Sequence, residues 1–187
     1  MKPVAYASLV AAPWKNGGGV TRELACHPVG AGFDDFLWRV SIADVHQSGP
    51  FSRFPGIDRV IVLLDGAGMT LRSDEGDHAL NVALVPHAFR GEAQIDAELV
   101  SSSRDFNLML RRGQAEGSMS ILRASTKLPP AQATRLLYCA SGEWEIGDDC
   151  MFNSGDHVLI ETGAANDAAM ITMLKAGALL CVDITLI

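Results

Sequence analysis

Short apolar segments separated by turn signals run along the whole chain, and they constrain its fold more than any other feature. Residues 36–45 alternate most clearly, with Trp38 and Val40 on one face and Arg39 and Ser41 on the other. Long stretches of helical periodicity are hard to find. This pattern indicates a β-sandwich or β-barrel. The expected strands cover residues 4–10, 20–26, 36–45, 59–64, 80–85, 95–100, 106–111, 119–124, 135–140, 143–146, 170–174 and 179–186, and Pro86 begins an expected bend over residues 86–92. The strand of residues 106–111 places Asp105, Asn107, Met109 and Arg111 on a common face.

Residues 49–71 join a loop rich in proline and phenylalanine to a strand and a turn. Prolines and glycines punctuate the loop, and the apolar strand of residues 59–64 follows it. Asp65-Gly66, between this strand and a second one starting at Met69, predicts a β-hairpin. A rigid, aromatic and partly polar loop at the mouth of a hairpin suits a binding site. The alternative is a turn fixed by proline whose phenylalanines cap the core.

Composition excludes several classes of protein. A chain of 187 residues can form one large all-β domain or two small ones. A net charge of −7 without any basic run argues against nucleic acid as a partner. The apolar stretches are too short to span a bilayer, and we expect residues 1–14 to hold an edge strand rather than a signal peptide. The four scattered cysteines favour buried, reduced thiols in a cytoplasmic protein.

A weak internal echo connects the two halves of the sequence. Residues 59–66 (RVIVLLDG) parallel residues 135–142 (RLLYCASG), and a Gly-Asp-His triplet follows each of them, at 76–78 and 155–157. This similarity indicates a duplicated β unit, with a seam near residues 113–117. Chance similarity between apolar strands is the alternative.

A second unusual stretch, residues 13–24 (PWKNGGGVTREL), contains three consecutive glycines. Asn16 and the glycine amides can present the backbone closely to a ligand, and Lys15, Arg22 and Glu23 add charges near it. The stretch is not a phosphate-binding P-loop, because the Gly-Lys-Ser/Thr ending is absent. A flexible turn with solvated charges is the alternative.

Arg39 and Ser41 share a face of an expected core strand, where a charge must be paired or serve a ligand. Arg59 opens the next apolar strand and can join the same polar cluster. Arginines that converge inside a β-barrel favour a carboxylate ligand, through bidentate hydrogen bonds. The alternative is an internal salt-bridge network that fixes strand register. The carboxylates that could pair with Arg39 are those of Glu23, Asp44, Asp58 and Asp105.

The sequence shows neither a metal site nor a catalytic set. None of the five histidines forms an HxH or HxxxH pair, so we expect isolated surface or turn histidines. No Ser–His–Asp set and no nucleophile elbow is recognisable. A general base stays open, since Glu23, Asp44 and His46 all lie near the expected site along the chain.

Four stretches together resemble the HutD/Ves family of bacterial proteins, in order and over about the first three-fifths of the chain. They are WKNGGGVTRE, FLWRVSIADVHQSGPFSRFPGIDRVIVLLDGAGMTL, FRGE at 89–92 and DFNLMLRRG at 105–113. The resemblance implies a cupin-type β-barrel, commonly in a bicupin arrangement, and an association with histidine-utilisation genes. It brings no established enzymatic activity.

The resemblance also implies a small-molecule pocket without the metal ligands of ordinary cupins, because Phe51, Ser52, Phe54 and Arg59 follow Gly49 where those ligands are expected. Matched motif by motif, the implied pocket residues are Trp14, Lys15, Asn16, Arg22, Glu23, Arg39, Ser41, Phe51, Phe54, Arg59, Asp105 and Asn107.

We therefore expect an all-β, cupin-type (RmlC-like jelly roll) fold, bicupin-like, in one compact unit of residues 1–187 with related halves at 1–115 and 116–187. The expected function is metal-free binding of a small carboxylate, without a cofactor, by a regulator in histidine catabolism. A metal-independent isomerase or hydrolase acting on a related acid is the second reading. An assembly protein with a barrel filled by side chains is the third. We expect a cytoplasmic homodimer that contacts neither nucleic acid nor membrane.

Overall fold

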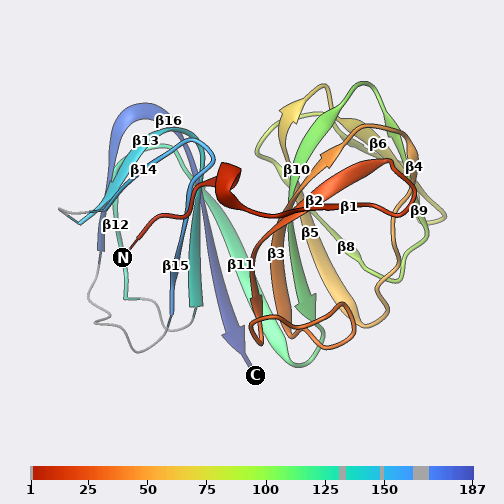
Figure 1. Cartoon of the computed structure of the whole chain (residues 1–187), viewed down its shortest axis with the longest axis horizontal. Helices are drawn as coiled ribbons and strands as arrows, with labels where there is room; N and C mark the ends of the chain where they lie inside the picture. The colour runs from red at the N-terminus through yellow and green to blue at the C-terminus, as the bar shows by residue number, and fades with distance from the viewer. Residues whose placement is uncertain (1, 131–133, 148–149, 162–168) are drawn as a thin grey trace. The chain divides into compact units, whose positions relative to one another are not determined.

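The computed structural model describes residues 2–130, 134–147, 150–161 and 169–187. Within these residues the chain is β-structure apart from loops and one 3-10 turn, η1 (Tyr6–Ser8). The chain divides into two compact units (Figure 1): Val10–Gln114 form one, and Met1–Leu9 with Ala115–Ile187 form the other. The expectation of one compact unit built from two halves stays a prediction.

The unit Val10–Gln114 contains two antiparallel sheets. The six-stranded sheet has the order β1 (Ala11–Pro13), β2 (Gly19–His27), β3 (Trp38–Val45), β10 (Ser103–Arg111), β5 (Ile57–Gly66) and β8 (Pro86–Arg90). The four-stranded sheet has the order β4 (Gly49–Pro50), β9 (Ile95–Leu99), β6 (Met69–Ser73) and β7 (His78–Leu80).

These two sheets pack face to face around one apolar cluster. The six-stranded sheet contributes Ala43, Val45, Ile61 and Leu63, and the four-stranded sheet contributes Met69, Leu71, Leu80, Ile95 and Ala97. Each strand alternates, so the buried side chains of β6 and β9 are separated by exposed or partly exposed ones. The face of the six-stranded sheet that carries Ile61 and Leu63 is called the inner face below.

The other unit is built on two long strands, β13 (Thr134–Ile146) and β16 (Ala169–Leu186), which pair along most of their length with bulges near Ser141. Its core surrounds the fully buried side chains of Trp144 and Phe152. The remaining strands are β11 (Ala115–Leu122) and β12 (Thr126–Leu128) on β16, and β14 (Cys150–Asn153) and β15 (His157–Ile160) on β13.

The prediction of a hairpin at Asp65-Gly66 is wrong. Strand β5 pairs with β10 and β8, whereas β6 pairs with β7 and β9 in the other sheet. Gly66 and Gly68 both have positive φ, and a Cβ on either would collide with neighbouring backbone. The connection therefore carries the chain from one sheet to the other instead of folding it back on itself.

Several expected strands also shift or merge. Residues 4–10 hold η1 and one isolated bridge at Val4 instead of a strand. The strand expected at 80–85 is a turn beyond Leu80, and the bend expected after Pro86 is strand β8. Proline is tolerated there because β8 is the edge of its sheet. Segments 135–140 and 143–146 are one strand, as are 170–174 and 179–186.

The two echoing segments occupy strands β5 and β13, and each begins with a buried arginine, Arg59 or Arg135. Each echo also ends at a glycine with positive φ, Gly66 or Gly142, pressed against the backbone of the paired strand. The two glycines therefore allow the same close approach of strand backbones in both places. A duplication of the β unit remains a prediction.

The cysteines, and the absence of a membrane-spanning helix among the described residues, concern both units. All four cysteines are buried and free, as expected. Burial raises the pKa of Cys139 to about 12 and that of Cys181 to about 11, so both thiols stay protonated at neutral pH. No helix in the described part of the chain combines the length and apolar character needed to cross a membrane.

Candidate functional site

Strand register brings a row of polar side chains together on the inner face. Ser41 of β3 pairs with Asn107 of β10, which pairs with Ile61 of β5. In the neighbouring register, Met109 of β10 lies between Arg39 and Arg59. Paired residues of an antiparallel sheet point to the same side. The alternation expected for residues 36–45 and 106–111 therefore holds, and it places these groups beside the apolar core.

Arg59 is the central cation of this face. Its residue is 7% exposed, and burial lowers its pKa to about 10, with Arg39 adding to the effect and Asp105 opposing it. Its hydrogen bonds are long: Nε donates to Asn107 Oδ1 at 3.4 Å and Nη1 to the Ser52 carbonyl at 3.5 Å. Among the described residues it forms no ion pair with a carboxylate.

Three phenylalanine rings surround the Arg59 guanidinium instead. Its Cζ atom lies 4.8 Å from the ring centre of Phe89, 5.5 Å from Phe54 and 5.6 Å from Phe51. Aromatic faces stabilise a cation, but they leave its hydrogen-bond donors unused. Arg59 is therefore desolvated, held in place by rings, and able to donate to an anion.

Arg135, at the equivalent place of the echo, is satisfied in a different way. Its Nε and Nη2 donate to both carboxylate oxygens of Asp183, at 2.6 and 3.1 Å, and its Nη1 donates to the Pro129 carbonyl at 2.8 Å. Such a bidentate pair is how a buried arginine serves stability alone. Arg59 differs from Arg135 because no carboxylate of the described residues pairs with it.

Asp105 is the second unsatisfied group. It is 1% exposed, and its Oδ1 has no hydrogen-bond partner among the described residues. Burial raises the pKa of the Asp105 carboxyl to about 7, although the Arg59 charge and a hydrogen bond with Asn107 act in the opposite direction. A buried polar atom without a partner carries a cost that native structures usually avoid, unless a ligand or ion completes it.

Arg39 is paired within the protein. Its Nε donates to Glu23 Oε2 at 2.8 Å, and its Cζ lies 4.9 Å from the ring centre of Phe33. Glu23 was one of four carboxylates expected to serve as its partner. The pair fixes β2 against β3, so Arg39 is less available to a ligand than Arg59.

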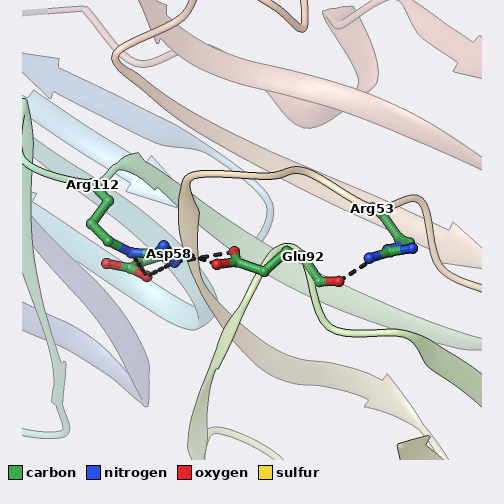
Figure 2. A network of polar contacts seen from close by, with 4 residues as sticks. All are labelled: Arg53, Asp58, Glu92 and Arg112. Atoms are coloured by element: carbon green, nitrogen blue, oxygen red, sulfur yellow. Dashed lines mark hydrogen bonds and ion pairs between the residues drawn. The ribbon is translucent and has the colours of Figure 1, made fainter.

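A surface network holds the loop of Phe51 and Phe54 in place. Figure 2 shows Arg112 between the carboxylates of Asp58 and Glu92, at 2.7 and 2.9 Å. Arg53 of the loop donates through Nε to the main-chain oxygen of Glu92 at 3.0 Å. Hydrogen bonds from Arg112 hold the pKa of Glu92 at about 2. The network joins β5, the end of β10, the loop of Phe51 and Phe54, and the turn that follows β8.

Backbone contacts press the same loop against the segment that follows β8. The Phe54 amide donates to the Gly91 carbonyl at 2.7 Å, and the Gly91 amide donates to the Ile57 carbonyl at 2.7 Å. A Cβ at Gly91 would lie 2.6 Å from the Phe54 carbonyl oxygen. The close approach requires glycine there.

Of the expected site residues, the register and the ring contacts bring eight together on or over the inner face: Glu23, Arg39, Ser41, Phe51, Phe54, Arg59, Asp105 and Asn107. Trp14 packs at the margin of the apolar cluster, and its Nε1 donates to Thr21 Oγ1 at 2.7 Å.

Three expected residues lie apart from this group. Arg22 points to the opposite side of the sheet from Glu23, where it pairs with Asp44 at 2.8 Å. Lys15 and Asn16 are exposed, and Asn16 Oδ1 accepts the Gly18 amide at 3.0 Å. The Gly17 amide donates to the Trp14 carbonyl. These groups stabilise their own turn.

The sequence reading missed Phe89 and a pair of histidines. His87 of β8 lies in register with Ile61, and His78 of β7 lies in register with Leu71 of the facing sheet. Their rings stack with centres 3.5 Å apart, and His87 also stacks on Phe89 at 5.9 Å. Burial and the His78 charge lower the pKa of His87.

The expectation of isolated surface or turn histidines is therefore wrong for His78 and His87, and also for His157, which is buried. Strand β8 carries the missing signal, because His87 and Phe89 alternate with exposed residues along it. Reading Pro86 as a bend hid that alternation.

The chemistry open to this site is recognition of an anion, with one candidate for proton transfer. Two bases considered from sequence are engaged, Glu23 with Arg39 and Asp44 with Arg22 and Arg104. Asp105 is the buried carboxyl whose pKa lies near neutrality. The described residues contain no group of three or more His, Cys, Asp or Glu side chains that could hold a metal ion.

Comparison with known proteins identifies relatives over most of the chain. The HutD family model matches residues 6–181. An uncharacterised 21.2 kDa protein in the hutC 3′ region of Pseudomonas putida is 38% identical over 135 residues, which cover 72% of this chain and 70% of that protein. Protein Ves of Escherichia fergusonii is 39% identical over 139 residues, with coverages of 72% and 70%.

Solved structures agree with these matches. The structure of HutD from Pseudomonas fluorescens SBW25 has a TM-score of 0.88 and 30% identity, and covers 99% of this chain and 98% of that one. A cupin 2 conserved barrel domain protein from Leptotrichia buccalis, at 10% identity, has a TM-score of 0.64 with coverages of 98% and 96%. The latter supports the fold alone. The expectations of family and fold class are both confirmed: the chain belongs to the HutD/Ves family and has its cupin-type β fold.

Proposed function

We propose that this protein binds a small carboxylate inside the barrel of residues 10–114, without a metal ion. The observation that carries the proposal is Arg59, a buried guanidinium with long hydrogen bonds and no carboxylate partner among the described residues. A buried cation without an anion is costly. A ligand carboxylate would supply the bidentate partner that Asp183 supplies to Arg135.

The surrounding residues have supporting roles in this proposal. Phe51, Phe54 and Phe89 exclude water from the Arg59 guanidinium and strengthen its interaction with an anion. Asn107 fixes the direction of the Arg59 side chain through Nε. Arg39, held by Glu23, adds positive potential from the neighbouring strand.

The biological setting that we propose is regulation of histidine catabolism. A relative is described by its position in the hutC 3′ region, and another by the name HutD. Acidic intermediates of histidine breakdown, such as urocanate or formylglutamate, are carboxylates of the proposed class. The structure of HutD from Pseudomonas fluorescens was determined in a formate condition, which makes formate a useful minimal probe.

The test is calorimetric titration with formate, urocanate and formylglutamate. We expect one of them to bind the natural protein, and Arg59→Met to weaken it by about a hundredfold, since Met keeps the apolar stem and removes the donors. Arg104→Met is the matched control, because Arg104 pairs with Asp44 on the opposite side of the same sheet. Absence of binding at millimolar concentration, or equal affinity in both variants, contradicts the proposal.

One observation favours a second function, a metal-independent isomerase or hydrolase. The pKa of Asp105 is about 7, which is the range that suits a general base. Protein incubated with pathway acids would then convert one of them, as followed by mass spectrometry. Asp105→Asn should abolish the conversion, while Glu23→Gln should reduce it only through the position of Arg39. An unchanged mixture excludes this function for the acids tested.

A further inference from the structure

The barrel interior holds two opposite charges that the protein leaves without partners. Arg59 has no ion pair with a described carboxylate, and Asp105 Oδ1 accepts no hydrogen bond from a described residue. Both groups are more than nine-tenths buried, at 7% and 1% exposure. In most proteins two such groups would satisfy each other. Here they stay apart, although each affects the pKa of the other.

Asn107 explains why they do not meet. It stands on β10 between the register positions of Met109, which pairs with Arg59, and Asp105. Its Oδ1 accepts from Arg59 Nε at 3.4 Å, and its side chain also hydrogen-bonds Asp105. Asn107 therefore contacts both groups, while Arg59 and Asp105 form no ion pair with each other.

The other charged or titratable groups near Asp105 already have partners within the protein. On β3, Arg39 is paired with Glu23, and Asp44 is paired with Arg22 and Arg104 across the sheet. His87 of β8 and His78 of the facing β7 stack on one another, and burial lowers the pKa of His87. The neighbouring inner-face residues Ala43 and Leu63 are apolar, as is Met69 of the facing sheet.

A ligand that carries only a carboxylate completes Arg59 and leaves Asp105 unsatisfied beside a second negative charge. Two carboxylates in a desolvated site repel each other. A ligand with a carboxylate at one end and a nitrogen-bound hydrogen at the other completes both groups, and a cationic nitrogen also balances the charge. The complement of an unpaired guanidinium and an unpaired carboxylate is a zwitterion.

Resting on the proposed carboxylate site, we propose that the ligand also carries an N–H donor, which Asp105 Oδ1 accepts, so that Asp105 is a specificity-determining residue for amino-acid-like acids. The ligand class is then a short zwitterionic acid whose carboxylate binds Arg59 and whose ammonium or other N–H group binds Asp105.

The experiment compares matched acids that differ only by an amino group: β-alanine with propanoate, 4-aminobutanoate with butanoate, and 5-aminopentanoate with pentanoate. Titrations are run at pH 8, where Asp105 is mostly ionised and the amines are protonated. In the natural protein we expect one amino acid to bind at least about tenfold more tightly than its deaminated partner. The chain length that binds best measures the span between Arg59 and Asp105.

Three variants assign the effect. Asp105→Asn should reduce the preference for the amino acid to less than about threefold, while Arg59→Met should weaken both members of each pair. Asp96→Asn, an exposed carboxylate on β9, is the control and should leave the preference unchanged. Because Asp105→Asn can alter folding, each titration of the natural protein is repeated in two buffers of different ionisation enthalpy, which counts protons taken up on binding.

The outcomes separate this inference from the proposed function. Equal or tighter binding of the deaminated acids, with uptake of about one proton, means that Asp105 is protonated from solvent when the ligand binds. Asp105 then accepts no hydrogen bond from the ligand. That result overturns the inference and keeps the carboxylate site. Binding of neither member of any pair, together with no binding of formate, urocanate or formylglutamate, removes both.

Discussion

At the scale of single residues, the molecule uses buried arginine in two opposite ways. Arg135 is neutralised by Asp183 through two hydrogen bonds, which secures β13 against β16. Arg59 occupies the matching position in the similar segment of residues 59–66, but aromatic rings surround its guanidinium in place of a carboxylate. Since a buried charge costs free energy unless it is paired, the second arrangement supports the ligand site that we propose at Arg59.

The pH dependence of stability should report on Asp105. Its folded-state pKa of about 7 exceeds the ordinary value of 3.8. A raised pKa means that its contribution is present at low pH and is lost as the pH rises from about 4 through 7. We expect Asp105→Asn to remove this loss. The free energy of unfolding of the variant should therefore exceed that of the natural protein by roughly 2–4 kcal/mol more at pH 8 than at pH 4.

Urea unfolding of both proteins at pH 4, 6 and 8 measures that difference. Asp96→Asn, which removes an exposed carboxylate, serves as the control and should follow the natural protein. Parallel pH profiles for Asp105→Asn and the natural protein would show that Asp105 does not carry the effect.

At the scale of the strands, the sequence predicted which segments are extended better than how they pair. Alternation along residues 36–45 and 106–111 correctly placed Arg39, Ser41 and Asn107 on one face. The hairpin at Asp65-Gly66 failed because a positive-φ glycine permits a turn without choosing the partner strand. The partner depends on packing of Gly66 against Ser103 and of Gly68 against Leu80, contacts distant in the sequence.

The candidate site could likewise be predicted only in part from the sequence. Glu23 and Arg22 are adjacent in the sequence, so strand alternation alone places only one of them on the inner face, and the structure selects Glu23. Phe89 and His87 escaped prediction because a proline at an edge strand resembles a bend. The absence of an ion pair between Arg59 and Asp105 could not be predicted either, since it depends on the side-chain contacts that each of them makes with Asn107.

The crossing between the sheets gives a test of this account. A Cβ at Gly68 would lie 2.1 Å from the Leu80 carbonyl oxygen, at a φ of +84°, so we expect Gly68→Ala to destabilise the protein by roughly 3 kcal/mol or more. Gly30→Ala is the control, with a φ of +78° and no atom within 4 Å. It should cost about 1 kcal/mol from backbone strain alone. Similar melting temperatures for the two variants would contradict the collision.

The network in Figure 2 predicts an acid response of the loop that carries Phe51 and Phe54. The pKa of Glu92 is lowered to about 2 from 4.5 by hydrogen bonds from Arg112. A lowered carboxyl pKa contributes stability above the ordinary value and loses it as the pH falls toward 2. We expect the stability of Glu92→Gln to fall less steeply than that of the natural protein as the pH drops from 5 to 2.

Glu75→Gln, which changes an exposed glutamate in the turn between β6 and β7, is the control for that experiment. Circular dichroism during acid titration gives the profile of each protein. An identical profile for Glu92→Gln and the natural protein would mean that the ion pair of Arg112 and Glu92 is too well solvated to affect stability.

At the scale of the whole molecule, association is a further prediction. The six-stranded sheet ends at β1 and β8, and exposed edge strands invite pairing with another chain. We propose a homodimer, so light scattering should give about twice the 19.9 kDa mass of one chain. A monomer that persists at high concentration would contradict this proposal.

The last prediction concerns metal. Ordinary cupins are expected to place histidine ligands after the glycine of the first motif, whereas this chain has Phe51, Ser52 and Phe54 after Gly49. Phenylalanine offers no lone pair to a metal ion. The paired His78 and His87 stack face to face, and the described residues place no third His, Cys, Asp or Glu with them in a metal-binding group. The four cysteines, soft ligands in principle, are buried with raised pKa values that favour the neutral thiol.

We therefore expect protein purified without chelator to carry less than stoichiometric transition metal, and its melting temperature to be the same with and without EDTA, because no metal–ligand bonds contribute to the folded state. Elemental analysis and paired thermal melts make the measurement, with His78→Gln as a companion variant that should also leave the metal content unchanged. One equivalent of zinc, iron, nickel or manganese, together with a melting temperature lowered by EDTA, would mean that a metal ion organises the barrel interior. The roles proposed for Arg59 and Asp105 would then have to be rebuilt around that ion.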